Sequence, residues 1–422
     1  MADDIRITDL AAPVLTELQR AAIDYGESLA VELTPQSILA DAIAATGLED
    51  FGPEDFLPRL ALLCDEWSGD TELTGIGRLS LRNKLLQHAR SRLLIQDTLK
   101  RHPEIHDVQI REPIIVAGLP RSGTTHLLNL MAADLRLRSL PLWESYEPIP
   151  MPGEPVTQDD RDPRYQRCLE QWQSMQQMTP LLAIMHPMDP DHIHEELELM
   201  GPDFASYNYE WLSVSPRWRD HYYTSDQAPH YRYMKTVLKI LTWQGGDRTG
   251  ETTRWVLKCP QHLEQLPVLH RVFPDATVAI THRDPVSVIQ SAATMIAYGQ
   301  RINRRRIDLG RVLAYWSERI AHLLDACVAQ RDSIPSSQSL DVLFHEFMRD
   351  DLGMVKKIYD KAGLAMSAAA EEQLQSYVRD HRRGQHGRIL YDLRTDFGVE
   401  PAELRRRFKA YCERFPIRIE VD

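Results

Sequence analysis

The sequence predicts an α/β fold built on a parallel sheet, with a helical region ahead of it. An apolar strand, a glycine-containing turn and a helix follow one another over residues 113–131, and strands alternate with helices over residues 253–297. Residues 1–105 show helical periodicity alone. We therefore expect a helical N-terminal subdomain at residues 1–105 and an α/β domain at residues 106–422.

Length, charge and cysteine content limit the class of protein. The 422 residues exceed the size at which one hydrophobic core stops growing, which favours a large domain with an appended subdomain. A formal net charge of -12 disfavours nucleic acid and polyanionic glycans as partners. Scattered cysteines without a C-x-x-C pair, an acidic start without an apolar signal segment, and no apolar run of membrane length predict a cytoplasmic protein with no integral membrane segment.

The first region is expected to be all-helical, with helices near residues 11–31, 35–46, 56–64 and 76–99. Leucines recur on one stripe of the last of these helices. A packed helical subdomain is the simpler interpretation. The alternative is that these apolar helices form a lid or an entrance to a lipophilic substrate site.

The segment that follows residue 113 predicts an anion site. Ile114, Ile115 and Val116 are typical of a strand buried on both faces, and glycine and proline then interrupt the run. Apolar residues next recur at helical spacing, so we expect a helix that begins near Thr124. The first amide hydrogens of a helix lack partners and, together with the helix dipole, attract anions. A strand-to-helix turn with a surface arginine is the plainer alternative.

The turn itself, Gly118–Thr125, has the G-x-x-x-x-G spacing of a phosphate-binding P-loop. Thr124 stands where ATP and GTP hydrolases carry the lysine that reaches the terminal phosphates, which argues against an ordinary NTPase. Arg121 supplies a positive charge from another position, and its planar guanidinium suits an anion with several oxygens.

Two acidic positions are candidates for a general base or an acceptor contact. Glu144 lies in a proline-rich stretch that should be irregular chain, where it is either a solvated carboxylate or a base beside the anion site. His192, His194 and Glu195 follow a Pro-Asp pair that we expect to start a helix. They form neither H-E-x-x-H nor a cysteine-containing set, so we expect no metal. A place for His194 and Glu195 in an acceptor pocket is the alternative to a structural role.

Cations at the ends of later strands complete the candidate site. Lys258 closes a strand, and Arg283 follows the next one; ligands of parallel sheets bind at such carboxyl ends. A lysine that closes a buried strand usually faces something negative, the alternative being a surface lysine. Arg283 and Ser291 could grip one phosphate between them. The basic loop 381–388 is either a linker or a cover for an anionic ligand.

Together these features resemble the sulfotransferases that use 3′-phosphoadenosine 5′-phosphosulfate (PAPS), in a bacterial branch related to the tyrosylprotein and heparan sulfotransferases. The similarity runs from about Pro113 to the C-terminus. The loop Gly118–Thr125 resembles the family's loop for the 5′-phosphosulfate, and Thr281-His-Arg283-Asp-Pro through Ser291 resembles its grip on the 3′-phosphate. The resemblance implies a P-loop-kinase-like parallel sheet with helices on both faces. It also implies PAPS as co-substrate and 3′-phosphoadenosine 5′-phosphate (PAP) as product.

The resemblance extends to single positions. It implies that Arg121 contacts oxygens of the co-substrate, that Lys258 neutralises the migrating sulfuryl group, and that Glu144 is the general base. Hydrogen bonds to the co-substrate would come from the rest of the loop: Ser122, Gly123, Thr124 and Thr125. The sequence Arg-Arg383-Gly is similar to the Arg-Lys-Gly nucleotide loop of cytosolic members, although its surroundings depart from that pattern.

The residue types agree with sulfuryl transfer. By analogy with phosphoryl transfer the reaction is loose and in line, so fixed cations can stabilise charge while a carboxylate takes the proton of an acceptor hydroxyl. An aromatic-rich middle and an acidic exterior favour a small-molecule or lipid acceptor. Two alternatives stay open, a P-loop kinase of nucleotides or small molecules and a non-catalytic nucleotide-binding module. The oligomeric state, a homodimer included, is left open.

Overall fold

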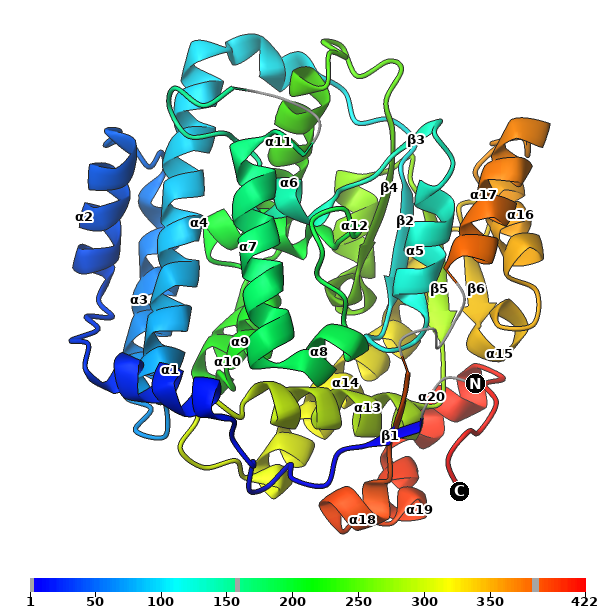
Figure 1. Cartoon of the computed structure of the whole chain (residues 1–422). Helices are drawn as coiled ribbons and strands as arrows, with labels where there is room; N and C mark the ends of the chain where they lie inside the picture. The colour runs from blue at the N-terminus through cyan, green and yellow to red at the C-terminus, as the bar shows by residue number, and fades with distance from the viewer. Residues whose placement is uncertain (1–3, 156–159, 382–386) are drawn as a thin grey trace.

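The computed structural model describes residues 4–155, 160–381 and 387–422, and a five-stranded sheet lies at its centre (Figure 1). The strands stand in the order β3-β4-β2-β5-β6, and every neighbouring pair is parallel. The predicted parallel sheet is therefore confirmed. Its strands are β2 (Ile114–Gly118), β3 (Leu137–Arg138), β4 (Arg254–Cys259), β5 (Thr277–His282) and β6 (Ser339–Leu343).

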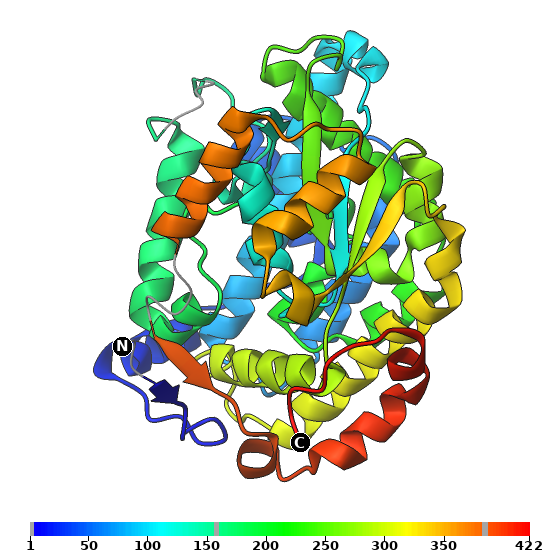
Figure 2. The same ribbon diagram turned by 90° about the vertical axis from the view of Figure 1, so that its right-hand side faces the viewer.

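Helices cover both faces of this sheet, as Figure 2 shows from the side of the later helices. On one face, Ile115, Leu257 and Ile280 belong to a core shared with α11 to α14. On the other face, Val116 and Ala279 pack with α5, α16 and α17. The helices of these two layers are α5 (Thr124–Ala132), α11 (Ala228–Gln244), α12 (Leu266–Val272), α13 (Pro285–Gly299), α14 (Leu309–Gln330), α16 (Asp351–Lys361) and α17 (Ala368–Asp380).

Further helices fill the connections between the layers and the end of the chain. The middle of the chain contributes α6 (Leu142–Tyr146), α7 (Pro163–Met178), α8 (Pro180–Met185), α9 (Asn208–Leu212), α10 (Pro216–Thr224) and the 3₁₀ helices η3 (Glu196–Asp203) and η4 (Pro260–Glu264). The end contributes α15 (Phe344–Phe347), α18 (Leu393–Phe397), α19 (Pro401–Arg405) and α20 (Lys409–Arg414). No helix among the described residues is long and apolar enough to cross a membrane.

The N-terminal region packs beside the sheet rather than on it (Figure 1). Its helices are α1 (Glu17–Glu27), α2 (Pro35–Thr46), α3 (Leu57–Ser68) and α4 (Gly75–Arg101). The expectation that this region is all-helical is wrong at its start, because β1 (Asp4–Arg6) pairs in parallel with β7 (Arg388–Leu390). Three-residue strands carry too little periodicity to be recognised in a sequence. The division into two units near residue 105 stays a prediction.

A buried carboxylate ties the N-terminal helices to the rest of the chain. Asp203, at the end of η3, accepts hydrogen bonds from Arg59 of α3 at 2.9 Å and from Arg92 of α4 at 3.0 Å. His230 of α11 lies 2.5 Å from the other carboxylate oxygen. Burial opposes the charge of Asp203, but the hydrogen bond with His230 and the charge of Arg59 hold its pKa below the ordinary value. The carboxylate of Asp203 thus links α3, α4 and α11.

We expect Asp203→Ala to lower the free energy of unfolding by about 3–5 kcal/mol, because the substitution leaves buried guanidinium groups without their carboxylate. The matched control is Asp65→Ala, which breaks an exposed ion pair with Arg217 and should leave stability unchanged. Urea unfolding followed by circular dichroism measures both. Equal stability of Asp203→Ala and the parent protein would contradict the role of this carboxylate in joining the two regions.

Candidate active site

The sheet order brings the sequence-predicted cations to one edge. β2 lies between β4 and β5, with Val116 opposite Lys258 and Gly118 opposite Thr281. The loop that leaves β2 therefore starts between the end of β4, which carries Lys258, and the end of β5, which leads into Arg283. Carboxyl ends of parallel strands are where open α/β sheets bind ligands.

A close backbone approach explains Gly118. A Cβ added at this position would lie 1.8 Å from the hydroxyl oxygen of Thr281, which no side chain could tolerate. That hydroxyl is 2.8 Å from Ser122 Oγ, and Ser122 also donates to the carbonyl of Leu119 at 2.6 Å. The buried hydroxyl of Ser122 thus holds the loop to β5 and shapes it from within.

The helix after the loop begins at Thr124, as the sequence predicts. Gly123 precedes it with a φ of 82°, a left-handed conformation that favours glycine, and it provides no side-chain cap. The first amide hydrogens of α5 therefore have no capping oxygen, which is the arrangement that suits an anion. Thr124 is buried, and Thr125 lines the cavity described below.

Arg121 lies at the centre of the loop and is held on three sides. Its backbone is left-handed, with a φ of 64°, which is rare for a residue with a side chain. The guanidinium donates to Ser291 Oγ at 3.0 Å, to the carbonyl of Met185 at 2.6 Å and to the hydroxyl of Tyr391 at 3.4 Å. A strained backbone and a fixed guanidinium at one position are typical of a functional site.

Arg283 and Ser291 both contact Arg121, and the expectation that they grip one phosphate between them stays a prediction. Ser291 bonds the side chain of Arg121, and Arg283 donates to the backbone carbonyl of Arg121. The remaining nitrogens of Arg283 pair with Glu420, from Nε at 2.8 Å and from Nη2 at 2.7 Å, and its guanidinium lies over the ring of Phe344. Any phosphate that binds Arg283 must therefore take the place of a carboxylate.

Lys258 is buried and faces two partners in the cavity. Its ammonium forms an ion pair with Glu195 and lies 3.4 Å from the hydroxyl of Thr125, at the start of α5. Its backbone amide donates to Glu196 at 2.7 Å, and the other oxygen of Glu196 is 2.6 Å from His262. The expectation that this lysine faces something negative agrees with the ion pair to Glu195. Glu196 thus holds the end of β4 through the backbone of Lys258.

Glu144 lies elsewhere than the sequence analysis expected. It is in the short helix α6 rather than on irregular chain, because Pro141 is at the N-cap position and the next proline, Pro148, follows the helix end. Its buried carboxylate forms an ion pair with Arg138 of β3, and it is not among the residues that line the cavity. The structure thus gives Glu144 a partner outside the place where Lys258 and Glu195 meet.

The stretch with the histidines is extended, and the helix expected there begins later, at Glu196. Two backbone hydrogen bonds hold it against the chain before α6, from Leu142 to the carbonyl of His192 and from His194 to the carbonyl of Leu140. Burial lowers the pKa of His192 to about 4 and that of His194 well below its ordinary value. These rings are therefore neutral at physiological pH. Among the described residues no three histidine, cysteine, aspartate or glutamate side chains are grouped so that they could hold a metal ion.

A cavity of about 310 Å³ opens from the loop toward the N-terminal helices. Arg121, Thr125, Lys258 and Glu195 line its sheet end. Residues of α4, α7, α8, η3, α9 and α13 form the other walls. This volume is within the range of small-molecule sites. In the sequence analysis, the alternative for the N-terminal helices is that they border a lipophilic site. Of these helices, α4 does line the cavity.

Several residues of this site were not singled out from the sequence. Tyr391 and Glu420 reach it from positions far along the chain, and no local pattern marks them. Glu196 directly follows Glu195. A signal did exist for His186, which lines the cavity and begins the same histidine-rich stretch. Arg383 lies outside the described residues.

Comparison with known proteins shows the family of this chain. A family model described as "Sulfotransferase family" matches residues 113–368, more than half of the chain. The chain belongs to the sulfotransferase family. The resemblance drawn from the loop and the Arg-Asp-Pro turn is thereby confirmed. Members of this family act as sulfotransferase enzymes with PAPS as their general donor.

Solved structures agree with this assignment. The sulfotransferase STF1 of Mycobacterium tuberculosis is 28% identical, with a TM-score of 0.78 over 90% of this chain and 99% of that one. Sulfotransferase STF9 of Mycobacterium avium, 24% identical, shares the fold with a TM-score of 0.81 over 93% of this chain and 100% of its own. Comparison with curated protein sequences gave no match. The sulfotransferase thus shares its fold with both neighbours over about nine tenths of its length.

Proposed function

We propose that this sulfotransferase moves the sulfuryl group of PAPS to a hydroxyl of a small or lipophilic acceptor, and that Glu195 is the general base. One observation carries the proposal: Lys258 and Glu195 meet beside Thr125, at the start of α5 and inside a cavity that Arg121 also lines. A cation and a carboxylate thus stand together at a helix start that suits an anion. The remaining walls leave room for an acceptor.

The loop and its cations fit the co-substrate. The uncapped start of α5, Arg121 and Lys258 are donors or cations suited to the 5′-phosphosulfate. Arg283 and Ser291, on either side of Arg121, suit the 3′-phosphate, provided that this phosphate displaces Glu420 from Arg283. Fixed cations that face developing charge supply much of the catalysis of such transfers.

The base is assigned to Glu195 by comparison of three candidates. Burial raises the pKa of Glu195 above the ordinary value, which makes its carboxylate a stronger base. Burial lowers the pKa of His194, which makes its imidazole a weaker one. Glu144 pairs with Arg138 and does not line the cavity. Glu195 alone combines a suitable basicity with a place beside Lys258.

The transfer balances with these groups alone. The acceptor oxygen forms a bond to sulfur while the bond between sulfur and the bridging phosphate oxygen breaks, in line with it. Glu195 takes the hydroxyl proton, and Lys258 faces the charge that develops on the moving group. The bisphosphate PAP then leaves with the electron pair of the broken bond.

All five cysteines are free, in keeping with a cytoplasmic location.

The two alternatives account for less of the geometry. A P-loop kinase would carry a lysine where Thr124 starts α5. A non-catalytic nucleotide-binding module would need the loop and Arg283 but not a buried lysine paired with a carboxylate at the cavity end.

Isothermal titration calorimetry with PAP and with ATP plus magnesium tests the proposed function. We expect PAP to bind and ATP to bind far more weakly. Arg121→Met should weaken PAP binding roughly ten- to a hundredfold, because it removes a charge-assisted contact. Arg101→Met, which breaks an exposed i, i+4 ion pair with Asp97, is the control and should leave the affinity unchanged. Absence of PAP binding to the parent protein would overturn the proposal.

A further inference from the structure

The cavity walls beyond the sheet end are mainly apolar. Leu81 of α4, Met175 of α7, Leu197 of η3, Trp211 of α9 and Met295 of α13 all line it. Such a wall favours a hydrocarbon body over a sugar, whose hydroxyl groups would lose their hydrogen bonds to water. Methionine side chains are flexible and adapt to the shape of an apolar ligand.

Polar side chains also line the cavity, among them Ser80, His186, His194, Gln300 and Asn303. On the α4 side, a charged pair and an amide form one connected group. Lys84 of α4 donates to Glu198 of η3 at 3.3 Å, and all three of Lys84, Glu198 and Asn208 line the cavity. Asn208 donates to the other oxygen of Glu198 at 2.6 Å. Burial opposes the charge of this carboxylate, but the charge of Lys84 lowers its pKa to about 2. Glu198 is therefore ionised, and each of its oxygens has a donor.

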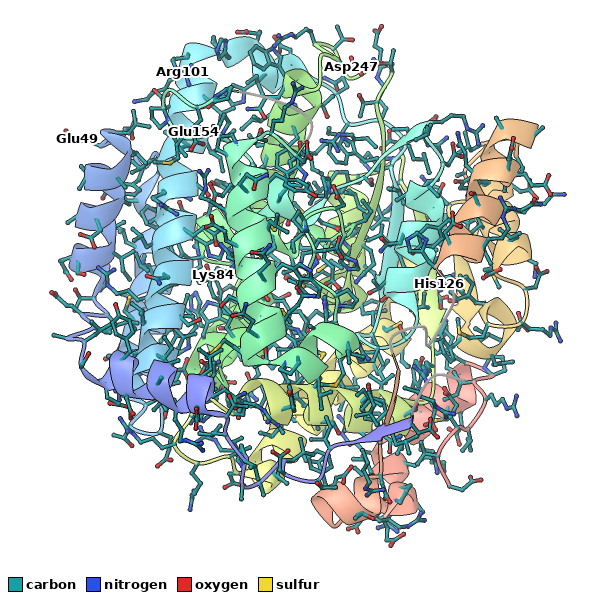
Figure 3. All side chains as sticks on the ribbon, viewed as in Figure 1. Glu49, Lys84, Arg101, His126, Glu154 and Asp247 are labelled. Carbon is teal, nitrogen blue, oxygen red and sulfur yellow. The ribbon has the colours of Figure 1, made fainter. Side chains whose placement is uncertain are left out.

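The ammonium of Lys84 has more donors than these contacts use. An ammonium has three N–H groups and no acceptor. Among the described residues its hydrogen-bond partner is Glu198, and its nitrogen lies 4.0 Å from the ring centre of Tyr146. Figure 3 labels Lys84, which lies between the ribbons of α4 and α7, where Met175 also borders the cavity. One N–H is thus left for a ligand. It needs an acceptor atom with a free lone pair, which on an alcohol or a phenol is an oxygen.

We propose that the acceptor is a neutral lipophilic alcohol or phenol that carries a second oxygen, and that this oxygen accepts a hydrogen bond from Lys84. The inference rests on the proposed function, since the reacting hydroxyl must lie beside Glu195 and Lys258. The paired charges of Lys84 and Glu198 leave no net charge on that wall, so a charged group on the acceptor would gain no counterion there. Specificity for the acceptor therefore comes in part from α4, ahead of the residues that the family model matches.

A series of straight-chain alcohols measures this directly. Primary alkanols and α,ω-alkanediols of equal chain length differ only in the second oxygen, and a disaccharide serves as the polar comparison. We expect kcat/KM to favour the diol over the alkanol by roughly tenfold or more at one chain length, the value of one charge-assisted hydrogen bond. Turnover of the disaccharide without turnover of any alkanol or diol would overturn the inference.

Variants of Lys84 assign the preference to this residue. Lys84→Met keeps the length of the side chain but removes every donor, so the ratio of kcat/KM for diol over alkanol should fall to about one. Lys100→Met, an exposed lysine of the same helix paired with Asp50, is the matched control and should keep the ratio. Lys84→Leu, which also lacks a donor, replaces Lys84→Met if the latter does not fold. An unchanged ratio in a folded Lys84 variant would reject the role of this lysine.

Failure of the inference and failure of the proposed function give different results. Calorimetric binding of PAP to the same samples reports on the proposed function alone. PAP binding combined with an absent diol preference rejects the acceptor class and leaves the sulfotransferase reaction standing. Absent PAP binding rejects both.

Discussion

Lys258→Met is expected to lower kcat roughly a hundred- to a thousandfold while the affinity for PAP changes little. Lys258 is buried at the end of β4 and faces the start of α5, where charge on a transferred group would develop. PAP lacks the sulfuryl group, so its binding depends less on this lysine than on Arg121 and Arg283. Single-turnover kinetics with PAPS measures the chemical step, and calorimetry measures PAP.

The control for this substitution is Lys235→Met. Lys235 is a half-buried lysine of α11 that donates to the carbonyl of Val272 at 2.8 Å and is not a cavity residue. Its loss should leave kcat near that of the parent protein. If Lys258→Met kept its turnover, the sulfuryl group would be stabilised by other residues and the assignment of Lys258 would be wrong.

Glu195→Gln should lower kcat roughly a hundred- to ten-thousandfold, the usual contribution of a general base. Burial raises the pKa of Glu195, so the parent enzyme should lose kcat/KM on the acid side at a pH above the ordinary glutamate value of 4.5. The sign follows because the base works only when ionised, and burial favours its protonated form. In Glu195→Gln this acid limb should disappear from the residual activity.

Glu144→Gln is the matched comparison, since Glu144 is a buried glutamate paired with a cation outside the cavity. Its turnover should stay well above that of Glu195→Gln, and it should keep the acid limb of the pH profile. The reverse result, with Glu144→Gln inactive and Glu195→Gln active, would return the base to α6.

The strand, loop and helix at residues 114–132 could be predicted because their signals are local. Apolar β-branched residues, glycines at fixed spacing and helical periodicity all lie within one short stretch, and β2 and α5 agree with them. Lys258 and Arg283 could be placed at the same edge because parallel strands end together. In the structure β4, β2 and β5 are neighbours in the sheet, so the ends of β4 and β5 flank the loop that leaves β2.

The surroundings of these cations could not be predicted, because they depend on contacts between distant parts of the chain. Glu195 reaches Lys258 only because residues 192–194 run against residues 140–142. Glu420 reaches Arg283 because buried Asp284 accepts hydrogen bonds from the amides of Glu420 and Val421. Helix α6 was missed because its prolines bracket the helix, whereas composition alone suggested that they interrupt it.

The parallel pairing of β1 with β7 has a consequence for how the enzyme is made. Asp4 pairs with Arg388, so β1 must wait for its partner until the sheet and its helices, which lie between the two strands in the sequence, have been synthesised. Tyr391 follows β7 directly, and its hydroxyl meets Arg121. Arg121 therefore receives this partner among the last events of folding, and a nascent chain that stops before β7 carries the phosphate loop without the complete site.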